Sequence, residues 1–301
     1  MSKKEEKKKT IKFFDEDSTF GGKVATAIEA IIACVVIGLI IALIVNLVSR
    51  KTAGNPVATI EVEGYGKIVA ELYPDEAPNT VTNFIKLANS GFYNGKVFHR
   101  TIPDFMIQGG DPNGDGTGSA TKGDLGVTDQ TATEEYTIKG EFVLNQYTNK
   151  LRHTKGVLSM ARSDYSSTGT AAITKKGYNS ASCQFFIMNA DNTSLDGSYA
   201  AFGKVIEGLD IVDKIANVDV QTRDQNTTDE NLVADRPIDP PVIKSITVDT
   251  KGVDYGMPET EEPFDYYNYM MQQYYGSSAS SAGSAGSAGS AADYVTPSYN
   301  E

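Results

Sequence analysis

The sequence predicts a mainly β domain, a closed barrel with two helices, that follows one transmembrane helix. Three observations lead to this fold class. Short apolar runs separated by Gly, Asn and Asp turns fill residues 57–250, and many short strands are typical of a barrel. Helical periodicity interrupts these strands at 80–88 and 209–216. A long apolar run precedes them at 24–48.

The chain begins with a charged tail and then this apolar run. Residues 1–23 lack apolar periodicity and predict a solvated tail. Within 24–48 the only ionisable side chains are Glu29 and Cys34, and a helix of that length, at about 1.5 Å per residue, exceeds a hydrocarbon core of about 30 Å. A buried soluble helix is the alternative, but residues 31–45 show no polar face. The run is therefore interpreted as a transmembrane anchor, with a short linker at 49–56.

Basic residues near the ends of the run predict its orientation. Seven Lys precede it, whereas Arg50 and Lys51 are the nearest basic residues after it. This bias predicts a cytoplasmic N-terminus and a domain outside the cytoplasm. Because no small-x-small cleavage site follows the run, we expect a single-pass protein of the cell membrane.

The domain at 57–250 contains six runs with the character of strands. They are residues 57–62, 68–73, 157–160, 184–188, 201–206 and 242–248. The first two flank a Gly-Tyr-Gly turn and predict a hairpin. After the domain, residues 251–301 combine Glu, Tyr and Met with Ser/Ala/Gly triplets, and this low complexity predicts a disordered tail.

Charge and composition exclude several function classes. Residues 52–301 hold 18 basic and 33 acidic side chains, a net charge of −15, so nucleic acid is not an expected partner. The only histidines are His99 and His153, too few for a zinc site. Residues 111–116 mimic the start of a calcium loop, but Lys122 at its twelfth position removes two ligand oxygens. We expect no metal or cofactor, and we interpret the loop as a turn.

One dense motif and four shorter ones point to a known family. Residues 97–111 read Val-Phe-His-Arg-Thr-Ile-Pro-Asp-Phe-Met-Ile-Gln-Gly-Gly-Asp, and Gly-Thr-Gly follows at 116–118. Gly-Val-Leu-Ser-Met-Ala, Gln-Phe-Phe-Ile, Leu-Asp-Gly and Phe-Gly-Lys-Val then begin at 156, 184, 195 and 202. Together these motifs resemble the cyclophilin-type peptidyl-prolyl cis/trans isomerases, here in a membrane-anchored, bacterial-like form. The resemblance implies a closed eight-stranded antiparallel barrel capped by two α-helices.

The resemblance also implies a substrate groove, and it does so residue by residue. The catalytic residues would be Arg100, Phe105 and Gln108. The substrate-binding residues would be Met106, Ala161, Arg162, Gln184, Phe186, Leu195 and Tyr199. The implied partners are proline-containing polypeptides, and the implied role is to assist the folding of exported proteins at the outer face of the membrane. A catalytically weak proline-peptide binding module and a surface structural protein are the alternatives.

These residue types suit isomerisation of an X-Pro bond. Rotation about a peptide bond faces a barrier of about 18–20 kcal/mol, and no bond breaks, so the site must bind the twisted bond better than the planar one. We expect the apolar side chains to hold the prolyl ring and Arg100 to donate to the twisted amide. Gln108 and Gln184 would hold the substrate backbone and orient Arg100.

Four features depart from the family pattern. Ser194 stands where many members have Trp, which makes binding of cyclosporin-type macrocycles doubtful, and Tyr199 stands where many have His. Residues 119–137 and 164–182 are longer than usual and are interpreted as insertions near the groove.

Overall fold

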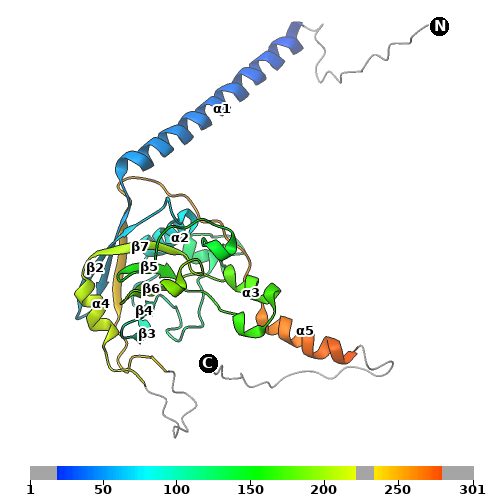
Figure 1. Cartoon of the computed structure of the whole chain (residues 1–301). Coiled ribbons are helices and arrows are strands. Elements are labelled where there is room, and N and C mark those ends of the chain that lie inside the picture. The colour runs from blue at the N-terminus through cyan, green and yellow to red at the C-terminus, as the bar shows by residue number, and fades with distance from the viewer. Residues whose placement is uncertain (1–18, 222–233, 280–301) are drawn as a thin grey trace, which may run out of the picture. The chain divides into compact units, whose positions relative to one another are not determined.

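The computed structural model describes residues 19–221 and 234–279 (Figure 1). The chain divides into two compact units. One comprises Met1–Gly54 with Gly252–Asp254, and the other comprises Asn55–Lys251 with Tyr255–Glu301. The eight strands and all the predicted site residues belong to the second unit.

The first unit contains a long helix, α1 (Thr19–Ala53), of 35 residues. It extends beyond the predicted apolar run at both ends, so that it also contains Lys23 and Arg50. Described apolar side chains along it are exposed, with Ile31 at 63% and Leu39 at 65%. Across the described residues, however, no helix has both the length and the apolar character needed to cross a membrane. The helix expected at 24–48 is present, but its assignment as a transmembrane span is not supported.

The second unit is built on one curled sheet of eight strands, paired antiparallel in the order β3-β4-β6-β5-β7-β2-β1-β8. The strands are β1 (Val57–Val62), β2 (Gly66–Leu72), β3 (Phe98–Ile102), β4 (Met106–Gly109), β5 (Val157–Met160), β6 (Phe185–Met188), β7 (Ala201–Glu207) and β8 (Ile243–Asp249). The six strands expected from the sequence match β1, β2, β5, β6, β7 and β8, and their ends differ by at most two residues. The dense motif supplies β3 and β4.

The barrel is open, which corrects the prediction of a closed one. β3 and β8 are the two ends of the sheet order, and within the described residues a single bridge between Val97 and Val242 joins the chain just outside them. The segment that leads into β8 contains Pro237, Pro240 and Pro241. Proline has no N–H to donate to a ladder of hydrogen bonds, so this segment cannot pair fully with β3.

Four helices belong to the second unit. They are α2 (Pro78–Asn89), α3 (Ala171–Tyr178), α4 (Leu209–Ala216) and α5 (Tyr266–Ala279), with short 3-10 turns η1 (Lys122–Leu125), η2 (Val143–Asn145), η3 (Ser166–Thr168) and η4 (Thr193–Leu195). α2 and α4 are the two helices expected from the sequence, whereas α3 lies in the predicted insertion at 164–182. The buried Glu141 carboxylate accepts hydrogen bonds from the amides of Asn79 at 3.0 Å and Thr80 at 2.8 Å, and it thereby caps the start of α2.

The core between α2 and the sheet is aromatic. Phe84 on α2 lies 5.4 Å from Phe185, edge to face, and 5.1 Å from Phe202. Tyr93 contacts the same cluster, and its hydroxyl donates to the Cys183 carbonyl at 2.9 Å. Buried aromatic rings contribute large apolar areas, so this cluster fixes the sheet beneath the predicted groove.

The C-terminal segment differs from the disordered tail expected at 251–301. Glu261 pairs with Thr137 in an antiparallel bridge, and α5 follows. The rings of Tyr165 and Tyr266 stack at 4.8 Å. The low-complexity composition of this segment concealed the aromatic residues near 264–269, which dock on the insertion. Residues 280–301 lie outside the described residues.

Candidate active site

The β3-β4 hairpin sets the position of the predicted catalytic residues. Arg100 on β3 lies opposite Gln108 on β4 in the strand register. The register shifts between Phe98 and Arg100, so that His99 is 5% exposed and faces the interior, while the Arg100 side chain is 41% exposed. The bulge therefore directs Arg100 toward solvent beside Gln108.

An apolar cavity of about 160 Å³ opens beside this hairpin. Its lining consists of Arg100, Phe105, Met106, Gln108, Ala161, Arg162, Phe186, Leu195 and Tyr199. These are nine of the ten residues that the sequence predicted for the groove. Its floor is firm because Met106 and Phe186 belong to a buried apolar cluster, against which Phe105, Leu195 and Tyr199 pack.

A second, polar cavity of about 180 Å³ adjoins the first. Gln184, the tenth predicted residue, lines it together with Ser and Thr hydroxyls and the Gly116–Gly118 backbone. Gln108, Ala161 and Arg162 line both cavities. The two cavities therefore form one groove, apolar at one end and polar at the other.

The two glutamines form a fixed chain of hydrogen bonds. Gln184 Nε2 donates to the carbonyls of Gly116 at 2.9 Å and Gly118 at 3.0 Å. Gln108 Nε2 donates to Gln184 Oε1 at 3.0 Å. This arrangement holds the Gln108 amide in place beside Arg100. Within the described residues, no hydrogen bond joins either glutamine to Arg100, so the expectation that they orient its guanidinium is not met.

Arg100 pairs instead with Asp235, a residue that the sequence reasoning missed. The Arg100 Nη2 to Asp235 Oδ2 distance is 3.5 Å. Asp235 has a positive φ of 64°, and its carbonyl accepts a hydrogen bond from the Thr101 amide at 2.9 Å. Both side chains of the pair are about 40% exposed (41% and 39%), so the pair is weak and leaves the guanidinium available to a ligand.

The loop after β4 is organised by one buried carboxylate. Asp111 is 1% exposed and accepts hydrogen bonds from the amides of Asn113 at 3.2 Å, Asp115 at 2.8 Å and Gly116 at 2.6 Å. A side chain at Gly118 would collide with Asp111 Oδ1, so the loop also needs glycine there. The carboxylate already has loop amides as partners, which favours the turn over the calcium loop. No cluster of three metal-ligating side chains occurs among the residues that the structure describes.

Arg162 is held in an aromatic cage at the junction of the two cavities. Its guanidinium carbon lies 4.6 Å from the ring centroid of Tyr199, 5.3 Å from that of Tyr178 and 5.5 Å from that of Phe142. Nε donates to the Ser198 carbonyl and Nη1 to the Ser163 carbonyl, both at 2.9 Å. Cation–π contacts and hydrogen bonds thus fix this side chain in one orientation.

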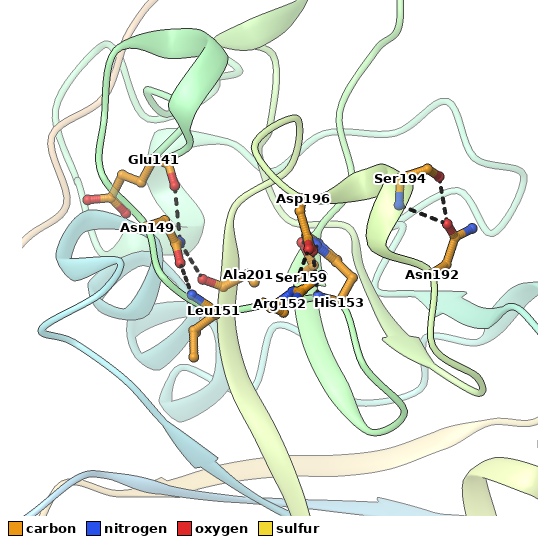
Figure 2. Close-up of polar contacts among 10 residues, drawn as sticks. All are labelled: Glu141, Asn149, Leu151, Arg152, His153, Ser159, Asn192, Ser194, Asp196 and Ala201. Atoms are coloured by element: carbon orange, nitrogen blue, oxygen red, sulfur yellow. Dashed lines mark hydrogen bonds and ion pairs between the residues drawn. The ribbon is translucent and has the colours of Figure 1, made fainter.

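Behind the apolar cavity, Asp196, His153 and Ser159 form a hydrogen-bonded chain in which His153 and Ser159 are buried and Asp196 is 26% exposed (Figure 2). His153 Nδ1 lies 3.1 Å from Asp196 Oδ1, and His153 Nε2 lies 3.0 Å from Ser159 Oγ. The order of residue types is that of a hydrolase triad, but Ser159 is fully buried, so its hydroxyl cannot reach a substrate. The imidazole stacks on Phe186 at 6.0 Å. These three hydrogen-bonded residues therefore support the floor of the apolar cavity.

The charge state of this chain follows from burial. Desolvation lowers the pKa of His153, although Asp196 acts in the opposite direction. Burial would raise the pKa of Asp196, but it is outweighed by hydrogen bonds from the His153 amide and ring and from Arg152, and the pKa is lowered. A neutral imidazole between a carboxylate and a hydroxyl is the result, since the desolvated ring does not favour charge.

Comparison with known proteins identifies the family. The model of the cyclophilin type peptidyl-prolyl cis-trans isomerase/CLD family matches residues 57–248. The chain belongs to this cyclophilin family.

Several relatives are named as enzymes of the same class. Peptidyl-prolyl cis-trans isomerase ppi1 of Schizosaccharomyces pombe is 36% identical over 194 residues, which cover 64% of this chain and 99% of that protein. Peptidyl-prolyl cis-trans isomerase B of Bacillus subtilis is 40% identical over 159 residues, which cover 53% of this chain and 90% of that protein. The chain is therefore a cyclophilin-type peptidyl-prolyl cis-trans isomerase.

Among solved structures, a cyclophilin type peptidyl-prolyl cis-trans isomerase of Cryptosporidium parvum, crystallised in the presence of the dipeptide Ala-Pro, is 28% identical. The match covers 64% of this chain and 99% of that chain, with a TM-score of 0.49.

Proposed function

We propose that this cyclophilin isomerises X-Pro bonds in the apolar cavity, with Arg100 as the residue that stabilises the twisted amide. The observation that carries the proposal is the position of the partly exposed Arg100 guanidinium beside the apolar side chains that line the same cavity. Phe105, Met106, Phe186 and Leu195 would enclose the prolyl ring and hold it while the preceding residue rotates.

The preference for the twisted state would be electrostatic. As the amide twists, it loses resonance, and the proline nitrogen regains a lone pair. A guanidinium directed at that nitrogen or at the adjacent carbonyl stabilises the twisted species more than the planar one. Gln108, fixed by Gln184, would hold the substrate backbone, and the Arg162 backbone would pair with the residue before proline. No bond is made or broken, so no nucleophile is needed.

The test is a protease-coupled isomerase assay of the full chain and of Arg100→Ala. A charge-assisted donor in a partly dry site is worth roughly 2.7–4 kcal/mol, so kcat should fall about a hundredfold to a thousandfold. Peptide affinity should change little, because Arg100 would act mainly on the twisted amide. Arg100→Lys keeps the positive charge but loses the planar guanidinium with its forked donors. Its kcat should lie between those of the wild type and Arg100→Ala.

Wild-type turnover in a folded Arg100→Ala protein would contradict the assignment. A wild-type chain that binds proline peptides but does not accelerate their isomerisation would instead support the alternative of a binding module. Circular dichroism of each variant supplies the control for folding.

We propose separately that the enzyme is held at the cell membrane, with a cytoplasmic N-terminus and its catalytic unit outside, where exported proteins would be its clients. The support is the Lys excess before α1 and the exposed apolar side chains of α1, which need an apolar partner. The described helices do not meet the requirement for a membrane span. Protease added to intact cells should digest the catalytic unit, and recovery of the chain in the soluble fraction would contradict the proposal.

Macrocycle binding is expected to be weak in this cyclophilin. Ser194 occupies the position where many members carry Trp, and its hydroxyl donates to Asn192 Oδ1 at 2.6 Å (Figure 2). Asn192 caps η4 by accepting bonds from the Ser194 amide and hydroxyl, and Ser194 inside η4 offers no ring to a ligand. We propose that isomerase activity is little inhibited by cyclosporin-type macrocycles, and an inhibition curve measures this directly.

A further inference from the structure

The insertion at 164–182, together with Ser163 just before it, forms a wall of the polar cavity. Ser163 and Ser180 line that cavity, and the Ser163 amide donates to Ser180 Oγ at 2.8 Å. Between them lie η3 and α3, which are packed closely enough that a side chain at Gly177 would meet the Ser163 carbonyl at 2.5 Å. The position of α3 therefore determines where this wall stands.

A segment from the end of the chain holds the insertion from outside. We name residues 259–269 the C-terminal brace. Its Glu259 exchanges two hydrogen bonds with Asn79 on α2, at 2.7 and 2.9 Å. Its Glu261 exchanges two backbone hydrogen bonds with Thr137, at 2.7 and 2.9 Å. These contacts fix the start of the brace to the body of the catalytic unit.

The brace contacts the insertion through one polar group and two rings. Asn179, at the end of α3, donates to Glu261 Oε2 at 3.0 Å. Phe264 lies 6.0 Å from Tyr165, edge to face, and 5.6 Å from Lys176 Nζ. The following ring, of Tyr266, stacks on Tyr165 at 4.8 Å with an interplanar angle of 12°. The brace thus contacts the last turn of α3 and the ring of Tyr165, which precedes η3.

The insertion in turn holds Arg162. The Arg162 guanidinium lies against the ring of Tyr178, the last residue of α3, and Nη1 donates to the Ser163 carbonyl. Because Arg162 lines both cavities, a shift of α3 changes the passage between them. A continuous set of contacts therefore links the brace to the groove.

We propose that the C-terminal brace is a specificity-determining element of this cyclophilin. By fixing α3, it sets the width of the polar end of the groove and so selects among peptides by the residues that precede proline. The proposal rests on the proposed path of the substrate, in which the residue before proline passes the Arg162 backbone toward the polar cavity. In the part of the chain that the structure describes, no hydrogen bond, ion pair or ring contact joins the brace to Arg100 or to the side chains around the prolyl ring. The brace would therefore act on substrate choice and leave the chemical step alone.

The test compares two double variants of the full chain. Phe264→Ala with Tyr266→Ala removes the rings that contact Tyr165. Tyr267→Ala with Met270→Ala removes two α5 side chains that are 55% and 45% exposed, and it serves as the matched control. Each is assayed on peptides that differ at the second residue before proline. A third variant, Phe264→Tyr with Tyr266→Phe, keeps both rings.

In the variant that lacks the rings of Phe264 and Tyr266, the ratio of kcat/KM between the best and the worst peptide should shrink at least about threefold. The change should come from the KM values, while kcat changes less than about twofold. Trypsin cleavage at Lys175 and Lys176 should become at least about tenfold faster, because the insertion is released. The control and the ring-keeping variant should match the wild type. Glu261→Gln, which weakens only the contact to Asn179, should give a smaller change in the same direction.

Two outcomes overturn the proposal. Faster trypsin cleavage of the insertion with unchanged kcat/KM ratios between peptides would show that the brace has only a structural role. Trypsin cleavage at the wild-type rate would show that the brace does not hold the insertion. Absence of isomerase activity in the wild type would count against the proposed function and not against the brace, since cleavage is measured independently. Circular dichroism and melting of each variant show that the sheet is intact.

Discussion

At the scale of single residues, the proposed division of labour in the groove separates binding from rate. Arg100 stands on the rim with a weak, exposed partner in Asp235, whereas the apolar side chains pack on a buried floor. A rim cation is free to turn toward a bond that twists. A packed apolar wall acts equally on both planar isomers and on the twisted state, so it contributes mainly to affinity.

Truncation of the pocket wall should therefore behave unlike loss of Arg100. Phe105 is partly buried against the floor cluster, so Phe105→Ala should raise KM about fivefold to thirtyfold and cost only a little stability. Leu144→Ala, at a 55% exposed position outside the cavity lining, is the matched control. A variant with normal KM and reduced kcat would contradict the assignment of Phe105 to the prolyl pocket.

The two histidines predict how stability depends on pH. Desolvation is the main cause that lowers the pKa of both His99 and His153 below the usual 6.5. The unfolded chain therefore binds protons before the folded chain as the pH falls, so the histidines should leave stability unchanged between about pH 6.5 and pH 8 and should lower it below pH 6.5. The lowered pKa values of Asp115 and Asp196, whose ordinary value is 3.8, would reduce stability only at still lower pH.

Melting curves between pH 5 and pH 8 measure this decline. His99→Gln should flatten the profile between pH 5 and 6.5, because among the described residues neither buried ring nitrogen of His99 has a hydrogen-bond partner, which makes charging costly. A profile that is flat down to pH 5 in the wild type would show that neither histidine has a lowered pKa in the folded chain.

At the scale of elements, hydrogen bonds connect the loop after β4 to the glutamine side chains of the groove. Asp111 holds the amides of the loop, and the loop carbonyls hold Gln184, which holds Gln108. Each link is a hydrogen bond between groups with little freedom of their own. The loop therefore acts as a support for the glutamine chain.

Two measurements test this view of the loop. Millimolar calcium should leave the melting temperature of the full chain unchanged, since Lys122 replaces the bidentate ligand and the Asp111 oxygens already accept three amides. Asp111→Asn should cost about 1–3 kcal/mol of stability with or without calcium, because amides at a buried site lose a charged acceptor. Stabilisation by calcium in the wild type, absent from Asp111→Asn, would instead favour a metal site.

Sequence patterns predict elements well where the contacts are local. The motif at 97–111 gives the β3-β4 hairpin, and through it Arg100 comes to lie opposite Gln108. The barrel is open because three prolines before β8 prevent full pairing with β3. This effect cannot be predicted until the segment before β8 is known to lie beside β3. The pairing of Arg100 with Asp235 spans more than a hundred residues of chain, and no local periodicity announces it. The docking of Tyr266 on Tyr165 is hidden in the same way, since a low-complexity composition averages over the few rings that pack.

At the scale of the whole molecule, the division into two units separates the catalytic sheet from α1. All eight strands and both cavities belong to Asn55–Lys251. A unit that contains its own core and its own site does not need the rest of the chain to fold or to act.

The last prediction follows from that division. A chain without residues 2–52 should keep its kcat/KM within about twofold and its melting temperature within about 2 °C, because it loses no residue of the sheet, the aromatic core or the groove. The brace must be retained in this shortened chain, since its loss should change peptide selectivity. Assay of both chains on the same peptides, with melting followed by circular dichroism, checks the result. A shortened chain that is folded but much less active would mean that α1 contributes to the site, and the separation of the two units would have to be abandoned.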